Sequence, residues 1–145
     1  AGRSSLPGKV LIQTRSPDHP MMQQFVERSY SDQARALLVR RETLHLPPKG
    51  AMGLIRSDST QEKDAIDFLD VLREQLPIRD AVRLIGPMPA LMTRRANMYR
   101  YQIIVHAHTR RAVHSLLEAA RDIGSQQKLG RKVSWFVEID PTETL

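Results

Sequence analysis

The sequence predicts an α+β fold of the ferredoxin-like kind, a split βαβ arrangement in which a four-stranded antiparallel sheet carries two helices on one face. Two observations predict this fold. From residue 49 onward, segments with the two-residue period of strands and segments with the 3.6-residue period of helices follow in the order β-α-β-β-α-β. In addition, 41% of the 145 residues are apolar, which is enough to fill one core. Because both helices cover the same face, we expect function on the other, open face of the sheet.

A short strand and two helices are expected before this domain. Residues 10–14 form an apolar run typical of a strand, yet no partner strand precedes them, which suggests the last part of a larger protein. Asp18 is the expected N-cap of a short helix over residues 21–28. Ser31 is the expected cap of a second helix, and Pro47 ends that helix because the residue before a proline disfavours helical backbone angles.

The first half of the ferredoxin-like domain is expected to open with a strand over residues 51–57. Ser59 and Glu62 then have the spacing of a capping box at the start of a helix. Four apolar residues recur at helical spacing in this helix and are expected to face the core: Ile66, Leu69, Leu72 and Leu76. Pro77 closes the helix.

The second half is expected to begin with a strand over residues 82–85. Gly86, Pro87 and Pro89 should end it, because proline fixes φ and removes a backbone donor. Residues 98–107 alternate strictly, which predicts a long strand with two distinct faces. One row is expected in the core: Tyr99, Tyr101, Ile103 and Val105. The other row is expected on the open face: Met98, Arg100, Gln102, Ile104 and His106.

A second helix and a last strand complete the expected domain. Thr109 is the expected N-cap of the helix, and Gly124 is expected at its end. The helix carries an apolar stripe for the core: Val113, Leu116, Leu117, Ala120 and Ile123. Residues 133–139 are the expected last strand, with one inward row: Val133, Trp135, Val137 and Ile139. Asp140 then reads as a strand-end carboxylate that holds a basic neighbour.

The composition narrows the classes of partner. The chain has 22 Lys and Arg against 16 Asp and Glu, a net charge of +6, which favours polyanions without proving that it binds them. The absence of cysteine excludes a disulfide framework, a thiolate zinc site and a cysteine nucleophile. No apolar run approaches the ~20 residues that span a bilayer, and no charged-then-apolar leader opens the chain. We therefore expect a soluble protein without membrane contact, which fits a cytoplasmic location.

Five arginines are candidates for contact with nucleic acid: Arg94, Arg95, Arg100, Arg110 and Arg111. They would form one patch if the loop before residue 98 folded toward the start of the second helix. The alternative for the last two is a solvated first helical turn. His106, His108 and His114 have a spacing that suits a transition metal in principle, but without cysteines or carboxylates in register we expect no metal site. No Ser-His-Asp order or carboxylate pair indicates catalysis.

Two other functional classes are open from the residues alone. A small hydrolase of the acylphosphatase kind needs a phosphate loop with glycine amides after the first strand, and the stretch SDSTQE at that junction has no glycine. A free-standing RNA-binding module of the ribosomal type, or a docking module without catalytic activity, fits both the charge and the expected fold.

Several segments in order along the chain carry a family resemblance: AGR, GKVLIQT, SPDHP, the LPP break, LIGPMPA, YRYQIIV and VSWFVEIDP. On these segments the chain resembles the C-terminal end of the PriA family of primosomal replication-restart helicases. The resemblance implies that residues 1–28 are the end of a second helicase lobe, with a strand and helices that precede the main domain. It also implies a helical connector over residues 29–48 and a C-terminal ferredoxin-like domain over residues 49–145.

The resemblance also implies what chemistry the chain lacks. Arg3 resembles the arginine finger of the last helicase motif, a residue that stabilises charge in phosphoryl transfer. The ATP-binding motifs and the zinc-binding cysteines of the family lie upstream and are absent. We therefore expect no catalytic residue and no cofactor in this chain. The parent protein would be an ATP-dependent 3'-5' DNA helicase that uses ATP, magnesium and zinc.

The partners implied by the resemblance are forked and single-stranded DNA, other primosome proteins and the C-terminal tail of the single-stranded-DNA-binding protein, SSB. Gln102 matches a glutamine of the family's tail pocket, whereas Met98 stands where the family has an arginine. Arg100 lies between them on the same strand face, and either Arg100 or the loop residues Arg94 and Arg95 could supply the donor that Met98 lacks. The implied setting is the bacterial cytoplasm, close to the nucleoid, and the implied state is a monomer.

Overall fold

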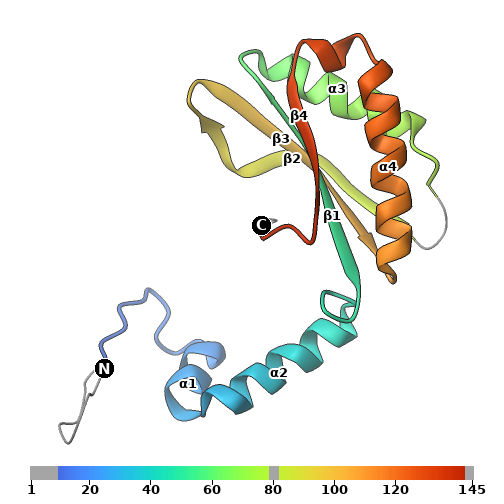
Figure 1. Ribbon diagram of the computed structural model, residues 1–145. Coiled ribbons are helices and arrows are strands. Elements are labelled where there is room, and N and C mark those ends of the chain that lie inside the picture. Colours follow the sequence, from blue (N-terminus) through green and yellow to red (C-terminus); the bar gives the residue numbers. More distant parts are fainter. Residues whose placement is uncertain (1–9, 79–81, 143–145) are drawn as a thin grey trace, which may run out of the picture. The chain divides into compact units, whose positions relative to one another are not determined.

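The computed structural model describes residues 10–78 and 82–142 (Figure 1). The chain divides into two compact units, Ala1–Val39 and Arg40–Leu145. The division falls inside helix α2, Tyr30–Thr43. All strands of the described residues belong to the second unit.

Helix α1 of the first unit spans Pro20–Glu27. Its N-cap is His19, whose Nδ1 accepts a hydrogen bond from the backbone amide of Met21 at 3.2 Å. The prediction that Asp18 caps this helix is therefore wrong. The helix begins one residue earlier than expected because Pro20 has the φ angle that the first helical position needs.

Helix α2 is preceded by Ser29, whose hydroxyl accepts a hydrogen bond from the Asp32 amide at 3.3 Å and donates one to the Asp32 carboxylate at 2.6 Å. This pair starts the helix, so the expected cap at Ser31 is also wrong. Residues 10–14 are not a strand in the described chain, since a strand needs a neighbour for its backbone hydrogen bonds. Neither α1 nor α2 contains a buried residue.

The second unit has the predicted α+β fold. Four antiparallel strands form one sheet in the order β2-β3-β1-β4, which is the ferredoxin-like order for a split βαβ chain. Figure 1 shows α3 and α4 side by side on one face of this sheet. The elements are β1 Ala51–Ser59, α3 Glu62–Gln75, β2 Val82–Arg95, β3 Met98–Ala107, α4 Arg110–Gln126, the 3-10 turn η1 Leu129–Arg131 and β4 Ser134–Ile139.

The core lies between the sheet and the two helices. Ile55 of β1 and Ile103 of β3 are paired neighbours, and both are fully buried beneath the helices. Helix α3 buries Phe68, a residue that the predicted stripe omitted, and leaves Ile66 only half-buried. The Phe68 ring lies 5.4 Å from that of Trp135, which closes the core beside η1. Leu69, Leu72 and Leu76 are buried as predicted.

Helix α4 begins as predicted, with the Thr109 hydroxyl accepting a hydrogen bond from the Ala112 amide at 3.3 Å. It does not end at Gly124, because it continues to Gln126. The glycine has a packing role instead. A Cβ atom on Gly124 would lie 2.9 Å from the Trp135 ring, so only glycine lets the helix approach the indole this closely.

Strand β2 runs through the prolines that were expected to end it. Ile85 pairs with Ile104 and Met88 pairs with Gln102, so the register shifts at Gly86 and Pro87 and then resumes. Proline has no backbone N–H to donate, but a bulge at this point lets the strand continue. This is possible because β2 is an edge strand, paired on one side only.

The expected capping box at the start of α3 does not form. Strand β1 extends to Ser59, whose hydroxyl accepts a hydrogen bond from the Gln61 amide at 3.2 Å. Gln61 occupies the N-cap position. Glu62 binds Tyr101 instead, because the phenol of this β3 residue donates to the Glu62 carboxylate at 2.5 Å. The contact ties the helix to the sheet.

Candidate functional site

The two faces of β3 have different chemistry but similar burial. Ile103 and Val105 face the helices with no exposed surface, as predicted. On the other face Gln102 is 1% exposed and Arg100 is 9% exposed. The row expected on an open face is therefore buried at its centre, and its polar groups are held by neighbours in the sheet.

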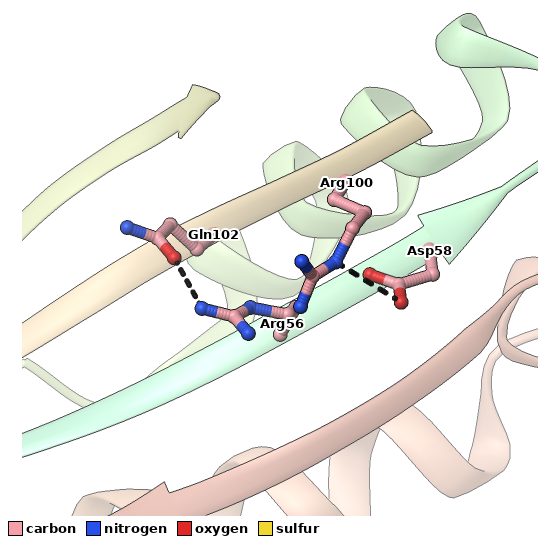
Figure 2. A network of polar contacts seen from close by, with 4 residues as sticks. All are labelled: Arg56, Asp58, Arg100 and Gln102. Carbon is pink, nitrogen blue, oxygen red and sulfur yellow. Dashed lines mark hydrogen bonds and ion pairs between the residues drawn. The ribbon is translucent and has the colours of Figure 1, made fainter. Parts of the chain in front are cut away.

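Four of these polar residues form one network, shown in Figure 2 and called here the β1–β3 network: Arg56, Asp58, Arg100 and Gln102. Arg56 is the sheet partner of Gln102, and its Nη2 donates to the Gln102 Oε1 at 2.9 Å. Asp58 is the sheet partner of Arg100, with the Arg100 Nε 3.6 Å from the Asp58 Oδ2. The two pairs lie next to each other on the face that points away from the helices.

The β1–β3 network carries an excess of positive charge, with two guanidinium groups and one carboxylate. Arg100 and Asp58 form an ion pair, but 3.6 Å is too long for a hydrogen bond. The other carboxylate oxygen, Asp58 Oδ1, is buried and has no hydrogen-bond partner among the described residues. The Arg56 guanidinium lies 5.7 Å from the centre of the Phe136 ring, close enough for a cation–π contact. The Asp58 side chain, which is 24% exposed, is therefore held in the network by its ion pair through Oδ2.

Sequence reasoning missed Arg56 and Asp58. The signal was present in the alternation of β1, where Leu54, Arg56 and Asp58 share one face. Two charged residues two apart, directly after the apolar Leu54 and Ile55, indicate a polar row on that face. Pairing them with β3 needed the register, which the sequence does not show.

The β2–β3 hairpin places two further candidates on the surface. Ala96 and Asn97 have φ angles of 49° and 63°, the left-handed backbone that a two-residue hairpin turn needs. The Arg94 guanidinium lies 5.1 Å from the centre of the Tyr99 ring, and its Nη2 donates to the Asn97 side chain at 3.4 Å. Arg94 and Arg95 are both exposed. Tyr99, expected in the core, is half-buried and supports Arg94 instead.

Arg110 and Arg111 lie beyond the opposite end of β3. The ten residues of β3 separate them from the hairpin arginines by roughly 30 Å, at about 3.3 Å per residue. The hypothesis of one continuous patch of five arginines is therefore wrong. Arg110 forms an ion pair with Asp140 at 2.6 Å, which confirms the basic neighbour expected for that carboxylate.

The expected tail-binding residues lie along one strand face but differ in surroundings. Met98 is half-buried where β3 begins, whereas Arg100 and Gln102 are buried within the β1–β3 network. Their roles in binding stay predictions. Arg3 lies outside the described residues.

The described residues offer neither a cluster of metal ligands nor a membrane-spanning helix. Residues 10–78 and 82–142 contain no group of three or more His, Cys, Asp or Glu placed to hold a metal ion. None of their helices is long and apolar enough to cross a membrane. The hydrogen bond to Glu62, together with burial, raises the pKa of Tyr101 above its ordinary value. That shift accompanies a contact between helix and sheet, away from the polar face.

Comparison with known proteins assigns the family. The model of the primosomal protein N C-terminal domain, PriA_C, matches residues 42–142. The replication restart protein PriA of Synechocystis is 39% identical over 108 residues, which cover 72% of this chain and 13% of the relative. PriA of Haemophilus influenzae is 25% identical over 145 residues, which cover 99% of this chain and 20% of the relative. The chain thus spans a fifth or less of these relatives, and it belongs to the PriA C-terminal domain family.

Proposed function

We propose that this chain serves replication restart as the C-terminal part of a primosomal DNA helicase. In this role it binds branched and single-stranded DNA and helps hold the C-terminal tail of SSB. The proposal rests on the family and on the name replication restart protein that the relatives carry. The chain would have no ATPase activity by itself. ATP, magnesium and zinc would belong to the rest of a longer protein in the bacterial cytoplasm, which works with other primosome proteins.

One observation carries the binding proposal: the buried cationic β1–β3 network lies near the exposed basic hairpin that joins β2 to β3. Arg94 and Arg95 present their guanidinium groups to solvent. Phosphates of DNA bind such groups mainly through charge, and the affinity falls as salt rises. We therefore place the first DNA contact at the hairpin.

The tail of SSB ends in a carboxylate, which needs guanidinium or amide donors. Met98 offers no donor, so Arg100 is the nearest guanidinium on the same strand face. The Asp58 carboxylate already pairs with Arg100, although at 3.6 Å. A tail carboxylate that binds here would compete with Asp58 for Arg100. Gln102, held through its Oε1 by Arg56, would supply an amide donor beside it.

Fluorescence anisotropy tests the proposal, with labelled fork DNA and a labelled SSB tail peptide at low and moderate salt. We expect Arg94→Glu with Arg95→Glu to weaken DNA binding strongly while leaving peptide binding less affected. Gln102→Ala should weaken peptide binding. Arg121→Glu, an exposed arginine far along α4, is the matched control and should leave both affinities unchanged. No binding of either ligand by the unmodified chain would refute the proposal.

A free-standing RNA-binding module is the competing function that the fold permits. The same titration with an RNA of matching sequence separates the two. Binding of RNA at least as tight as binding of fork DNA would favour the alternative.

A further inference from the structure

A pocket of about 330 Å³ lies at the end of the sheet opposite the Arg94 and Arg95 hairpin. Its walls come from the residues after α2, from the first residues of β2 and from the end of β3. The polar residues that line it are three histidines and one arginine: His45, His106, His108 and Arg83. None of the described lining residues is acidic.

The fold holds the histidines together through backbone contacts. His45 has a φ angle of 53°, and its carbonyl oxygen accepts a hydrogen bond from His106 Nε2 at 2.8 Å. The same carbonyl packs against Gly50, where a Cβ atom would lie only 1.7 Å from it. The rings of His45 and His108 meet edge to face, with their centres 4.4 Å apart. The segment that carries His45 is thereby fixed to the end of β3.

The described lining of this pocket carries one positive charge, that of Arg83. Arg83 is exposed, so its guanidinium is accessible to a ligand. Helix α4 begins two residues after His108 and has no acidic residue in its first turn. Its first two residues are Arg110 and Arg111, although the positive end of a helix dipole favours negative charge there. Arg110 is already paired with Asp140 at 2.6 Å, so among the described lining residues Arg83 is the guanidinium that the pocket offers to an anion.

We propose that this pocket binds a phosphate group, either of a nucleic-acid backbone or of free phosphate. Arg83 would donate to two phosphate oxygens, since a guanidinium matches the geometry of a phosphate. The imidazole of His106 donates its Nε2 hydrogen to the His45 carbonyl. It therefore needs a second proton to donate to an anion as well. The site is separate from the β1–β3 network and does not require that network to bind DNA or the SSB tail.

A phosphate fits these residues better than a metal ion does. His106 already uses Nε2 in a hydrogen bond, and within residues 10–78 and 82–142 no set of three metal-ligating side chains converges. Arginine repels a cation but binds a phosphate, and Arg83 is the permanently charged residue among the described residues that line the pocket.

Nuclear magnetic resonance of the histidine rings tests the proposal on the whole 145-residue chain. Inorganic phosphate or a short DNA duplex is added at about pH 6, within the range where imidazoles take up protons. Sodium chloride at equal ionic strength is the reference. We expect the rings of His45, His106 and His108 to shift with phosphate beyond any shift with chloride. Arg83→Gln should weaken phosphate binding about tenfold, the loss of a charge-assisted hydrogen bond.

The controls distinguish the two sources of phosphate. Arg121→Gln should leave phosphate binding unchanged because Arg121 does not line the pocket. If the duplex displaces inorganic phosphate, the ligand is a nucleic-acid backbone; if it does not, the ligand is free phosphate. Ring shifts no larger than those with chloride, or phosphate binding unaffected by Arg83→Gln, would overturn the proposal. Neither result bears on the peptide titration at Gln102.

Discussion

The two faces of strands β1 and β3 are both buried, but they are built from opposite kinds of residue. Toward the helices, the paired Ile55 and Ile103 fill the core. On the other face, Arg56 donates a hydrogen bond to its sheet partner Gln102 at 2.9 Å. Burial of apolar groups stabilises a fold, whereas burial of charged groups contributes little net stability and often costs some. The comparison indicates that the helix-covered face contributes most of the stability, so the binding role proposed for the polar face does not conflict with folding.

The largest loss of stability is expected on the helix-covered face. Ile103→Ala should lower the free energy of unfolding by about 2–5 kcal/mol, through lost burial and the cavity left behind. Chemical denaturation followed by circular dichroism measures it. A loss as small as that of a surface substitution would mean that this face is not the core.

A smaller loss is expected in the β1–β3 network. Asp58→Asn removes the carboxylate that pairs with Arg100 and should cost about 1–3 kcal/mol. The same change should strengthen binding of the SSB tail peptide, because the tail carboxylate no longer competes with Asp58. Denaturation and anisotropy on one preparation give both values. Weaker peptide binding, in a variant shown to be folded, would contradict a carboxylate site at Arg100.

The contact between helix and sheet should contribute less. Tyr101→Phe removes the hydrogen bond to Glu62 and is expected to cost about 0.5–1.5 kcal/mol near neutral pH. Because folding raises the pKa of Tyr101, its contribution is present below the ordinary value of 10.0 and is lost as the pH rises through the folded pKa. Unfolding curves of both proteins across alkaline pH should therefore converge. A constant gap at high pH would contradict this cause of the shift.

The hairpin should show the smallest effect on stability. Arg95→Ala is exposed and should change the free energy of unfolding by less than about 0.5 kcal/mol. It should nevertheless weaken DNA binding and reduce the salt slope of the affinity by about one unit. Anisotropy at several salt concentrations measures this slope. An unchanged slope would remove Arg95 from the DNA contact.

Much of the fold was predictable because the local patterns were strong. The strict alternation of residues 98–107 gave the bounds of β3, and Thr109 gave the start of α4. The prolines of β2 misled the prediction because a bulged edge strand tolerates a missing donor. Gly124 led to a wrong prediction of the helix end. A glycine is also required where a helix packs closely against a large side chain, and here that side chain is Trp135.

The candidate site was predictable only in part. Alternation placed Arg100 and Gln102 on one face, away from the helices. Their partners Arg56 and Asp58 come from a strand more than 40 residues earlier, and the pairing depends on the register of β1 with β3. Burial of the polar row is likewise a property of the assembled sheet. Long-range pairing of this kind is not encoded in local periodicity.

The central claim is that the polar face of β3 holds the SSB tail through its buried donors. The most direct test is the affinity of the tail peptide for Gln102→Ala and for the unmodified chain, measured by anisotropy with circular dichroism to verify folding. The account predicts that the folded variant binds the peptide at least several-fold more weakly while its affinity for fork DNA stays within about twofold, since one lost hydrogen bond changes binding by this order. Equal peptide affinity in a folded variant would contradict it.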